Sequence, residues 1–242
     1  MARVLLHQKA MTRRSHLLLA AALCSLLTHS AVGATRREKG KGIIQRGEEV
    51  LFRIEFEKIR GAQEVETYLF RHLNKDKSLA IEERTELKNK ELAFYSMKNR
   101  QSGVSATLKI ANGEATYTRV RDGKTDIRKE TIRRDIPTIT GPQISAYIAS
   151  QGKKLAEKGI IRFLLPVLDR AESIEFEIIR KDEVVHEMRP CNPLYQMFVR
   201  KIMIEFDPKA QEIRQIYGRI MPMVKNGSDW QPVEAMLVYS KS

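Results

Sequence analysis

The sequence predicts a mainly β protein: a large curved antiparallel sheet or incomplete barrel of about eleven strands, with one helix packed against it. Apolar and polar residues alternate over much of residues 50–239, which is the period of a strand with one buried face. Asn112-Gly113 and Asp122-Gly123 tolerate the positive φ of tight hairpin turns and separate strand-like segments. The pattern also lacks the alternation of strands and long helices that is typical of doubly wound nucleotide-binding folds.

The first predicted strand is the run in which Val50, Phe52, Ile54 and Phe56 alternate with mostly polar residues. Similar runs follow, each bounded by turn residues, and they predict an antiparallel meander. The strands of this part are predicted over residues 50–57, 64–73, 79–87, 91–98 and 104–110, and between the two hairpin turns.

A helix is predicted after the alternation stops at Pro137 and Gly141-Pro142. Pro142 suits the first position of a helix, and Gly159 suits its end. Gly152 is a candidate interruption within this helix. Strand character then returns over residues 160–165, 173–180, 183–188, 197–206, 212–221 and 233–239.

The domain organisation begins with a predicted signal peptide over residues 1–34. Basic residues precede the apolar run 17–27, and the small residues of segment 30–34 form the cleavage site. Met11 is an alternative start. The apolar run is shorter than the roughly 20 residues of a transmembrane helix, so no transmembrane segment is expected after cleavage. Residues 35–46 are predicted to be a flexible basic leader, and residues 47–242 a single β-rich domain.

The chain is basic, with 43 Lys and Arg residues against 30 Asp and Glu residues. This balance suits anionic partners such as phospholipid head groups, whereas export argues against nucleic acid. Cys191 is the only cysteine after the predicted cleavage site, so an intramolecular disulfide is excluded. This favours the bacterial periplasm, with an extracellular location as the alternative. The candidate residues for an anionic partner are Lys124, Arg128, Lys129, Arg133 and Arg134, for which a solvated surface is the alternative.

Motifs for catalysis or metal binding are weak in this sequence. His72 and His186 are the only histidines after residue 34, and His186, Glu187 and Cys191 lack a recognised metal-ligand spacing. A nucleophile elbow, a phosphate-binding glycine loop and a zinc-protease helix are also missing from the sequence. We therefore expect a protein without catalytic activity, metal or cofactor, and an envelope hydrolase is a minor alternative.

Aromatic and aliphatic side chains on the predicted strands have two alternative roles. A curved sheet of eight or more strands can enclose an apolar ligand, or the same side chains can fill a solid core. The candidates for lining a ligand cavity are Phe52, Ile54, Phe56, Phe94 and Tyr117.

The order of these elements resembles that of uncharacterised bacterial periplasmic β-rich proteins. The resemblance comprises an exported leader, a long meander, a helix near Gly141-Pro142, and late strands carrying residues 204–208 (IEFDP) and 217–219 (YGR). In outline it is similar to the lipoprotein carriers LolA and LolB, in which a curved sheet holds acyl chains against helices. The resemblance implies a non-enzymatic periplasmic protein that binds a lipid or acylated molecule within the sheet. The alternative function is a structural module that docks another envelope protein through exposed strands or the basic hairpin around Asp122-Gly123.

Overall fold

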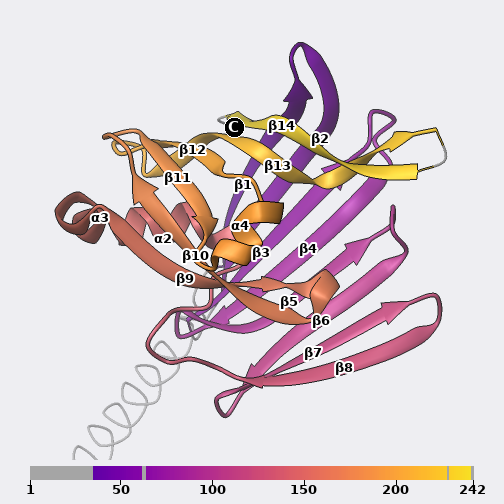
Figure 1. Ribbon diagram of the computed structural model, residues 1–242, viewed down its shortest axis with the longest axis horizontal. Coiled ribbons are helices and arrows are strands. Elements are labelled where there is room, and N and C mark those ends of the chain that lie inside the picture. Colours follow the sequence, from indigo (N-terminus) through magenta and orange to yellow (C-terminus); the bar gives the residue numbers. More distant parts are fainter. Residues whose placement is uncertain (1–34, 62–63, 228, 241–242) are drawn as a thin grey trace, which may run out of the picture. The chain divides into compact units, whose positions relative to one another are not determined.

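One antiparallel sheet dominates the computed structural model, which describes residues 35–61, 64–227 and 229–240 (Figure 1). Its 14 strands lie in the order β8-β7-β6-β5-β4-β3-β2-β1-β14-β13-β12-β11-β10-β9. Consecutive strands are neighbours except that the chain passes from β8 at one edge to β9 at the other. The two halves of the meander are joined in the middle, where β1 pairs with β14. The predicted signal peptide lies outside the described residues.

The strand bounds divide the sheet into two halves. The first half contains β1 (Arg36–Arg46), β2 (Glu49–Arg60), β3 (Val65–Leu73), β4 (Leu79–Lys88), β5 (Glu91–Asn99), β6 (Val104–Ala111), β7 (Glu114–Arg121) and β8 (Lys124–Thr131). The second half contains β9 (Ile160–Val167), β10 (Glu172–Arg180), β11 (Val185–Pro190), β12 (Ile202–Asp207), β13 (Glu212–Asn226) and β14 (Asp229–Ser240). Short helices accompany the second half: η1 (Gly141–Gln143), α2 (Ile144–Ser150), α3 (Gly152–Lys158), η2 (Leu168–Arg170) and α4 (Pro193–Phe198).

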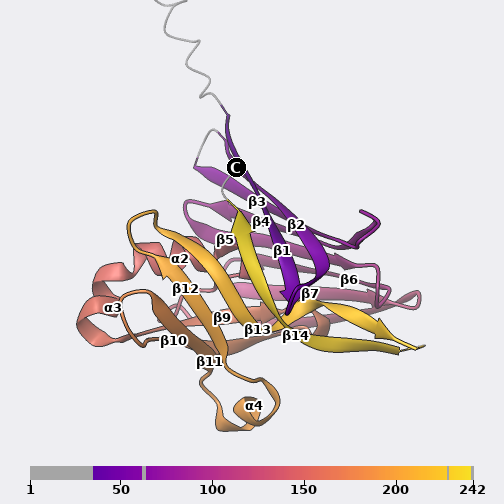
Figure 2. The same cartoon turned by 90° about the horizontal axis from the view of Figure 1, so that it is seen from above.

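The sheet curls so that its inner face forms the core (Figures 1 and 2). One buried cluster is built mainly from β1 to β7 and β14, and a second from β9 to β13 with α2 and α3. In the second cluster Tyr147, Ile148 and Leu155 anchor the two helices on the inner face. Ile216 and Tyr239 contact both clusters, so they mark the boundary between the two halves of the core.

The two edges of the sheet approach each other through side chains, without a backbone ladder between β8 and β9. The Tyr117 hydroxyl lies 2.6 Å from Ser173 Oγ, and Arg128 lies 3.7 Å from Glu172. The segment before α2 covers the edge of β9, where the Ile139 N–H donates to the Leu164 carbonyl. The described residues therefore form a strongly curved but unclosed sheet, which confirms the predicted fold class in its coarse form.

The prediction of a flexible leader over residues 35–46 is wrong, because β1 pairs on both sides, with β2 and β14. Its buried positions are Gly40, Gly42 and Ile44. They alternate as in any strand, but two of the three are glycines, so the apolar periodicity was hidden in the sequence. This added strand is one reason why the observed count exceeds about eleven.

The predicted helix is observed as two short helices on either side of Gln151, and Gly159 ends α3 with a left-handed φ of 69°. The strand predicted over residues 197–206 is wrong in its first part, where α4 lies instead. The Asn192 side chain accepts a hydrogen bond from the Leu194 N–H, and Pro193 occupies the first turn. These local helix-start signals outweigh the strand-like composition that follows.

Candidate binding site

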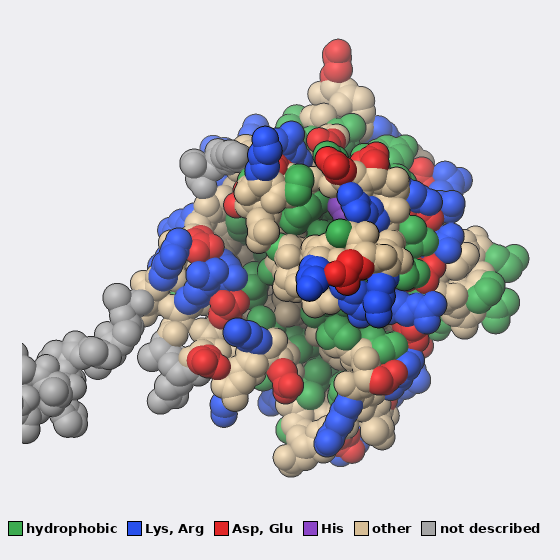
Figure 3. Space-filling view, turned by 90° about the vertical axis from the view of Figure 1, so that its left-hand side faces the viewer, with side chains coloured by type: hydrophobic (Ala, Val, Ile, Leu, Met, Phe, Trp, Pro, Cys, Tyr) green, Lys and Arg blue, Asp and Glu red, His purple; other side chains and the backbone are tan. Residues whose placement is uncertain are grey.

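A hollow of about 1010 Å³ lies on the inner face between α2, β1 to β3 and β13. Ala146 and Ala149 of α2 form one apolar wall, and Ile213 and Ile216 form another. Figure 3 shows apolar side chains within the depressed central part of one face, between charged side chains. The alanine side chains of α2 are too small to fill the space in front of the sheet, which leaves a hollow. Its interior is apolar because these alanines and the two isoleucines face it.

The floor of the hollow is aromatic. Phe56 stacks on Phe70 with ring centroids 5.4 Å apart, and it makes a T-shaped contact with Tyr239 with ring centroids 5.8 Å apart. The Phe56 ring lies directly over β1, since a Cβ atom added to Gly40 would lie 2.0 Å from the ring. Gly40 therefore fixes the depth of the hollow by letting an aromatic ring rest on bare backbone.

The rim of the hollow is charged and balanced. Its cations are Lys39, Lys58, Arg60 and Arg214, and its carboxylates are Glu38, Glu57, Asp207 and Glu212. Lys58 lies 3.2 Å from Glu66 and over the ring of Tyr68. Equal numbers of opposite charges give the opening little net field.

Asp207 organises one side of this rim. Its carboxylate accepts hydrogen bonds from the backbone N–H groups of Lys209 and Ala210 and lies 2.6 Å from the Arg214 guanidinium. The hydrogen bond from the Ala210 N–H and the pairing with Arg214 lower the pKa of Asp207 to about 2. The turn that follows β12 is thus held by a carboxylate that remains ionised at all but very acid pH.

Three neighbouring strands lead from this open rim to a closed interior. Along the inner face each passes from a rim or floor residue to a buried one: Glu38, Gly40, Gly42 and Ile44 on β1; Lys58, Phe56 and Ile54 on β2; Tyr68, Phe70 and His72 on β3. The same inner face is therefore open at one end and filled at the other.

A buried polar cluster, His72–Glu83–Tyr95, fills part of the closed end. His72 Nε2 lies 3.2 Å from Glu83 Oε1, and the Tyr95 hydroxyl donates to Glu83 Oε2. Burial acts to raise the pKa of Glu83, but the hydrogen bonds with His72 and Tyr95 outweigh it and hold the pKa below its usual value. Burial also raises the pKa of Tyr95. A Cβ atom at Gly141 would lie 3.9 Å from Glu83 Oε2, which places this cluster beside the hollow that Gly141 lines.

The five predicted lining residues lie in different places. Phe56 lines the inner hollow, while Phe52 lines a separate hollow of about 850 Å³ together with Trp230 and other residues. Ile54 and Tyr117 are buried in the first core cluster. Phe94 is half-buried and pairs with Glu86 and Lys109, on the face opposite to Tyr95.

The floor residues that the sequence reasoning did not select are Phe70 and Tyr239. Both stand in phase with the inward positions of their strands, so their periodicity was visible. Whether an inward position faces a hollow or a filled core depends on the strands packed beside it. Around this hollow, β1 to β3 come from the start of the chain and β14 comes from its end, so the sequence pattern of one strand could not show it.

The five predicted residues for an anionic partner lie on β8 and in the segment after it. Three of them have acidic partners: Arg128 with Glu172, Lys129 with Glu114, and Arg133 with Asp135 and Glu175. The hydrogen bond to Asp135, followed by that to Glu175, raises the pKa of Arg133. Lys124 and Arg134 are exposed. Much of this positive charge is consequently neutralised by neighbouring carboxylates.

His186, Glu187 and Cys191, which the sequence brings close together, have different surroundings. The His186 ring packs against Phe206, whereas Glu187 pairs with Lys181 at 2.9 Å. Burial, followed by the nearby carboxylates, raises the pKa of the Cys191 thiol to about 11, so the thiol is protonated at neutral pH. Within the described part of the chain, groups of three or more His, Cys, Asp or Glu residues suited to a metal ion are absent.

The helices of the described residues are too short or too polar to cross a membrane. Comparison with known proteins gives no matching family model and no matching curated protein. A solved structure from Brucella abortus, a beta-barrel-like protein of the domain of unknown function DUF1849, is similar with a TM-score of 0.48 and 10% identity. The match covers 85% of this chain and 95% of that chain.

Proposed function

We propose that this protein is a non-enzymatic binding protein of the bacterial periplasm that holds an apolar or amphipathic ligand, such as a lipid or an acylated molecule, in the inner hollow. The observation that carries the proposal is the aromatic floor of Phe56, Phe70 and Tyr239 beneath a space of about 1010 Å³. Pockets for drug-sized ligands range from about 300 to 1,000 Å³. The hollow therefore has room for one large ligand or for the acyl part of a lipid.

The charges of the rim indicate which head group the ligand would carry. Four cations and four carboxylates line the hollow, and pairs such as Arg214 with Asp207 already satisfy each other. An anionic head group would have to compete with these carboxylates for the cations. The geometry therefore favours a ligand whose buried part is apolar and whose exposed part is zwitterionic or uncharged.

The test is displacement of a fluorescent fatty-acyl probe, together with native mass spectrometry of protein purified from its own envelope. Ala149→Trp places a large ring into the hollow from α2 and is expected to weaken probe binding at least about tenfold, since it removes most of the apolar contact. Lys154→Trp, an exposed substitution on α3, is the matched control. Equal binding by both variants, or wild-type protein that carries and binds no apolar ligand, would end the proposal.

Docking of another envelope protein is the second candidate function, and β8 is the observation that favours it. This strand is at the edge of the sheet, and Ile127 on it is 62% exposed. A partner strand could add to this edge through backbone hydrogen bonds. Ile127→Pro would block such pairing, because proline has no backbone N–H to donate. We expect this variant to lose a partner in a pull-down experiment, and Ile127→Ser, the control, to keep it. A partner that both variants keep would contradict the docking function.

A further inference from the structure

The α4 segment presents its apolar side away from the protein. Met197, Phe198 and Leu194 are 77%, 70% and 68% exposed, and they are the three most exposed large apolar side chains that the structure describes. Their spacing of three and four residues places them on one side of the helix. Figure 2 shows α4 projecting from the sheet, and the corresponding projection in Figure 3 is largely apolar.

The opposite side of α4 is fixed to the sheet. The Tyr195 hydroxyl donates to Glu172 at 3.2 Å, and the Arg170 guanidinium lies over the Tyr195 ring. The Gln196 amide donates to the Pro190 carbonyl at 2.7 Å. A surface helix normally turns its apolar side to the core. Tyr195 and Val199 pack against the second core cluster, so α4 has apolar residues on both sides, and those of its outer side are left uncovered.

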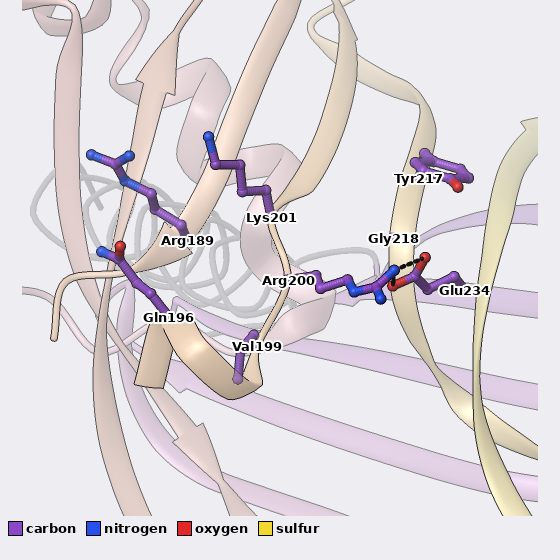
Figure 4. Close-up of a pocket in the computed structure, with 8 residues that line it drawn as sticks. All are labelled: Arg189, Gln196, Val199, Arg200, Lys201, Tyr217, Gly218 and Glu234. Atoms are coloured by element: carbon purple, nitrogen blue, oxygen red, sulfur yellow. Dashed lines mark hydrogen bonds and ion pairs between the residues drawn. The ribbon is translucent and has the colours of Figure 1, made fainter. Parts of the chain in front are cut away.

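Basic side chains surround this projection. A hollow of about 480 Å³ beside α4 is lined by Arg189, Arg200 and Lys201 against the single carboxylate of Glu234 (Figure 4). Arg200 and Lys201 pair with Glu234 at 2.9 Å and with Glu187 at 3.4 Å, but their side chains remain 79% and 62% exposed, so lipid phosphates can reach them beside these carboxylates. Arg219 is exposed and lines a neighbouring hollow with Phe198. Cations thus stand at the base of an apolar projection, where they can contact anionic groups.

We infer that α4 and the basic residues beside it form a membrane-docking site, in which Leu194, Met197 and Phe198 enter an anionic lipid layer while Arg200, Lys201 and Arg219 bind its phosphate groups. Amphipathic segments bind the lipid interface by this combination of buried apolar area and attraction to anionic lipids. A protein partner fits less well. A six-residue helix offers far less than the about 800 Å² per partner of a stable interface, whereas insertion into lipid gains from each apolar side chain.

The inference does not depend on a ligand in the inner hollow, so it is tested separately. The purified protein is mixed with vesicles of phosphatidylglycerol and phosphatidylethanolamine, or of phosphatidylcholine alone, and binding is measured by flotation. Binding to the anionic vesicles is expected to exceed binding to phosphatidylcholine and to weaken as salt rises.

Variants separate the apolar from the basic contribution. Leu194→Ser, Met197→Ser and Phe198→Ser combined should lower affinity for anionic vesicles at least about tenfold, because three exposed apolar side chains are removed. Ile127→Ser on β8 is the control of similar exposure and should bind as wild type. The side chains concerned are exposed, so circular dichroism should show all these variants folded.

The basic contribution is tested with Arg200→Gln and Arg219→Gln combined, which should weaken binding and reduce its dependence on salt. Lys154→Gln and Lys158→Gln combined remove the same charge from exposed positions on α3 and should have little effect. Wild-type protein that fails to bind anionic vesicles, or serine variants that bind as well as wild type, would overturn the inference. So would an equal loss of binding in the Ile127→Ser control, since it would place the contact elsewhere.

Discussion

The inner face of the sheet is open at one end and closed at the other, although the same strands form both ends. On β3, Phe70 contributes to the floor of the hollow, whereas His72, two residues further along, is buried in a hydrogen-bonded cluster with Glu83 and Tyr95. At the open end aromatic rings face empty space, and the charges lie at the surface. At the closed end the Glu83 carboxylate holds both His72 Nε2 and the Tyr95 hydroxyl, while His72 Nδ1 is buried without a hydrogen-bond partner.

One curved sheet can thus combine a filled, hydrogen-bonded end with an end that leaves a hollow. Removing one member of a buried hydrogen-bonded cluster leaves its partners unsatisfied, so the closed end tolerates little change. The open end has unfilled space into which side chains can move, so changes there should alter the hollow more than the fold. The substitutions below compare the two ends.

The largest effect is expected for Glu83→Leu at the closed end. It leaves His72 and Tyr95 buried without their acceptor, and the free energy of unfolding should fall by about 3–5 kcal/mol in urea denaturation. Replacing the whole cluster (His72→Leu, Glu83→Leu and Tyr95→Phe) should recover much of this loss, since no buried polar group is then left without its partner. If Glu83→Leu lowered the free energy of unfolding by less than about 1 kcal/mol, His72 and Tyr95 would not depend on Glu83 for their burial, and the prediction would be wrong.

A pair of glycine substitutions on β1 gives the next largest effect. Gly42→Ala brings a Cβ atom to 2.9 Å from the Val238 carbonyl, which cannot move freely, and should cost about 1–3 kcal/mol. The three atoms nearest to a Cβ atom at Gly40 all belong to the Phe56 ring, a side chain that can turn into the hollow, so Gly40→Ala should change stability by less than about 1 kcal/mol. Urea denaturation and binding of the fluorescent acyl probe distinguish the two variants. Gly40→Ala should weaken probe binding with little loss of stability, whereas Gly42→Ala should lower stability.

A smaller and pH-dependent effect is expected at Asp207 on the rim. Its pKa in the folded protein, about 2, is below its ordinary value of 3.8, so the ionised form stabilises the fold above that value and this contribution disappears as the pH falls through about 2. Asp207→Asn removes it, and the urea midpoints of wild type and variant should converge between about pH 4 and pH 2. If the urea midpoints of wild type and Asp207→Asn stayed equally far apart at about pH 2, the charge of Asp207 would not be the cause. The difference would then come from its hydrogen bonds with the Lys209 and Ala210 N–H groups.

The smallest effect is expected for Lys58→Met, which removes the ion pair with Glu66 at the rim. The Lys58 and Glu66 side chains are only 17% and 26% exposed, so salt screens this pair less than a fully exposed one. The loss of stability should be about 1 kcal/mol, the upper end of the range for surface pairs, and should shrink only slightly at high salt. Lys154→Met on exposed α3 is the control. If Lys58→Met lowered the free energy of unfolding as much as Glu83→Leu, the rim would be as important for stability as the buried cluster, and the contrast between the two ends would be wrong.

The strands and their turns were largely predictable because the alternation of Val50, Phe52, Ile54 and Phe56 and the Asn112-Gly113 turn are local signals. The strand β1 was not, since Gly40 and Gly42 occupy its buried positions and carry no apolar signal. Helix α4 was missed because its three apolar residues resemble a strand composition while their exposed side faces away from the core. Among the predicted lining residues, Phe56 lies in the hollow, whereas Ile54 beside it is buried.

The fold class, the inward side of the predicted strands and an interruption of the helix near Gly152 follow from the amino-acid sequence alone, because these depend on neighbouring residues and on backbone preference. The pairing of β1 with β14 and the common floor of Phe56, Phe70 and Tyr239 depend on the folded chain. Those contacts join residues far apart in the chain. Their register and the space left between them are set by the packing of the whole sheet, which no local pattern encodes.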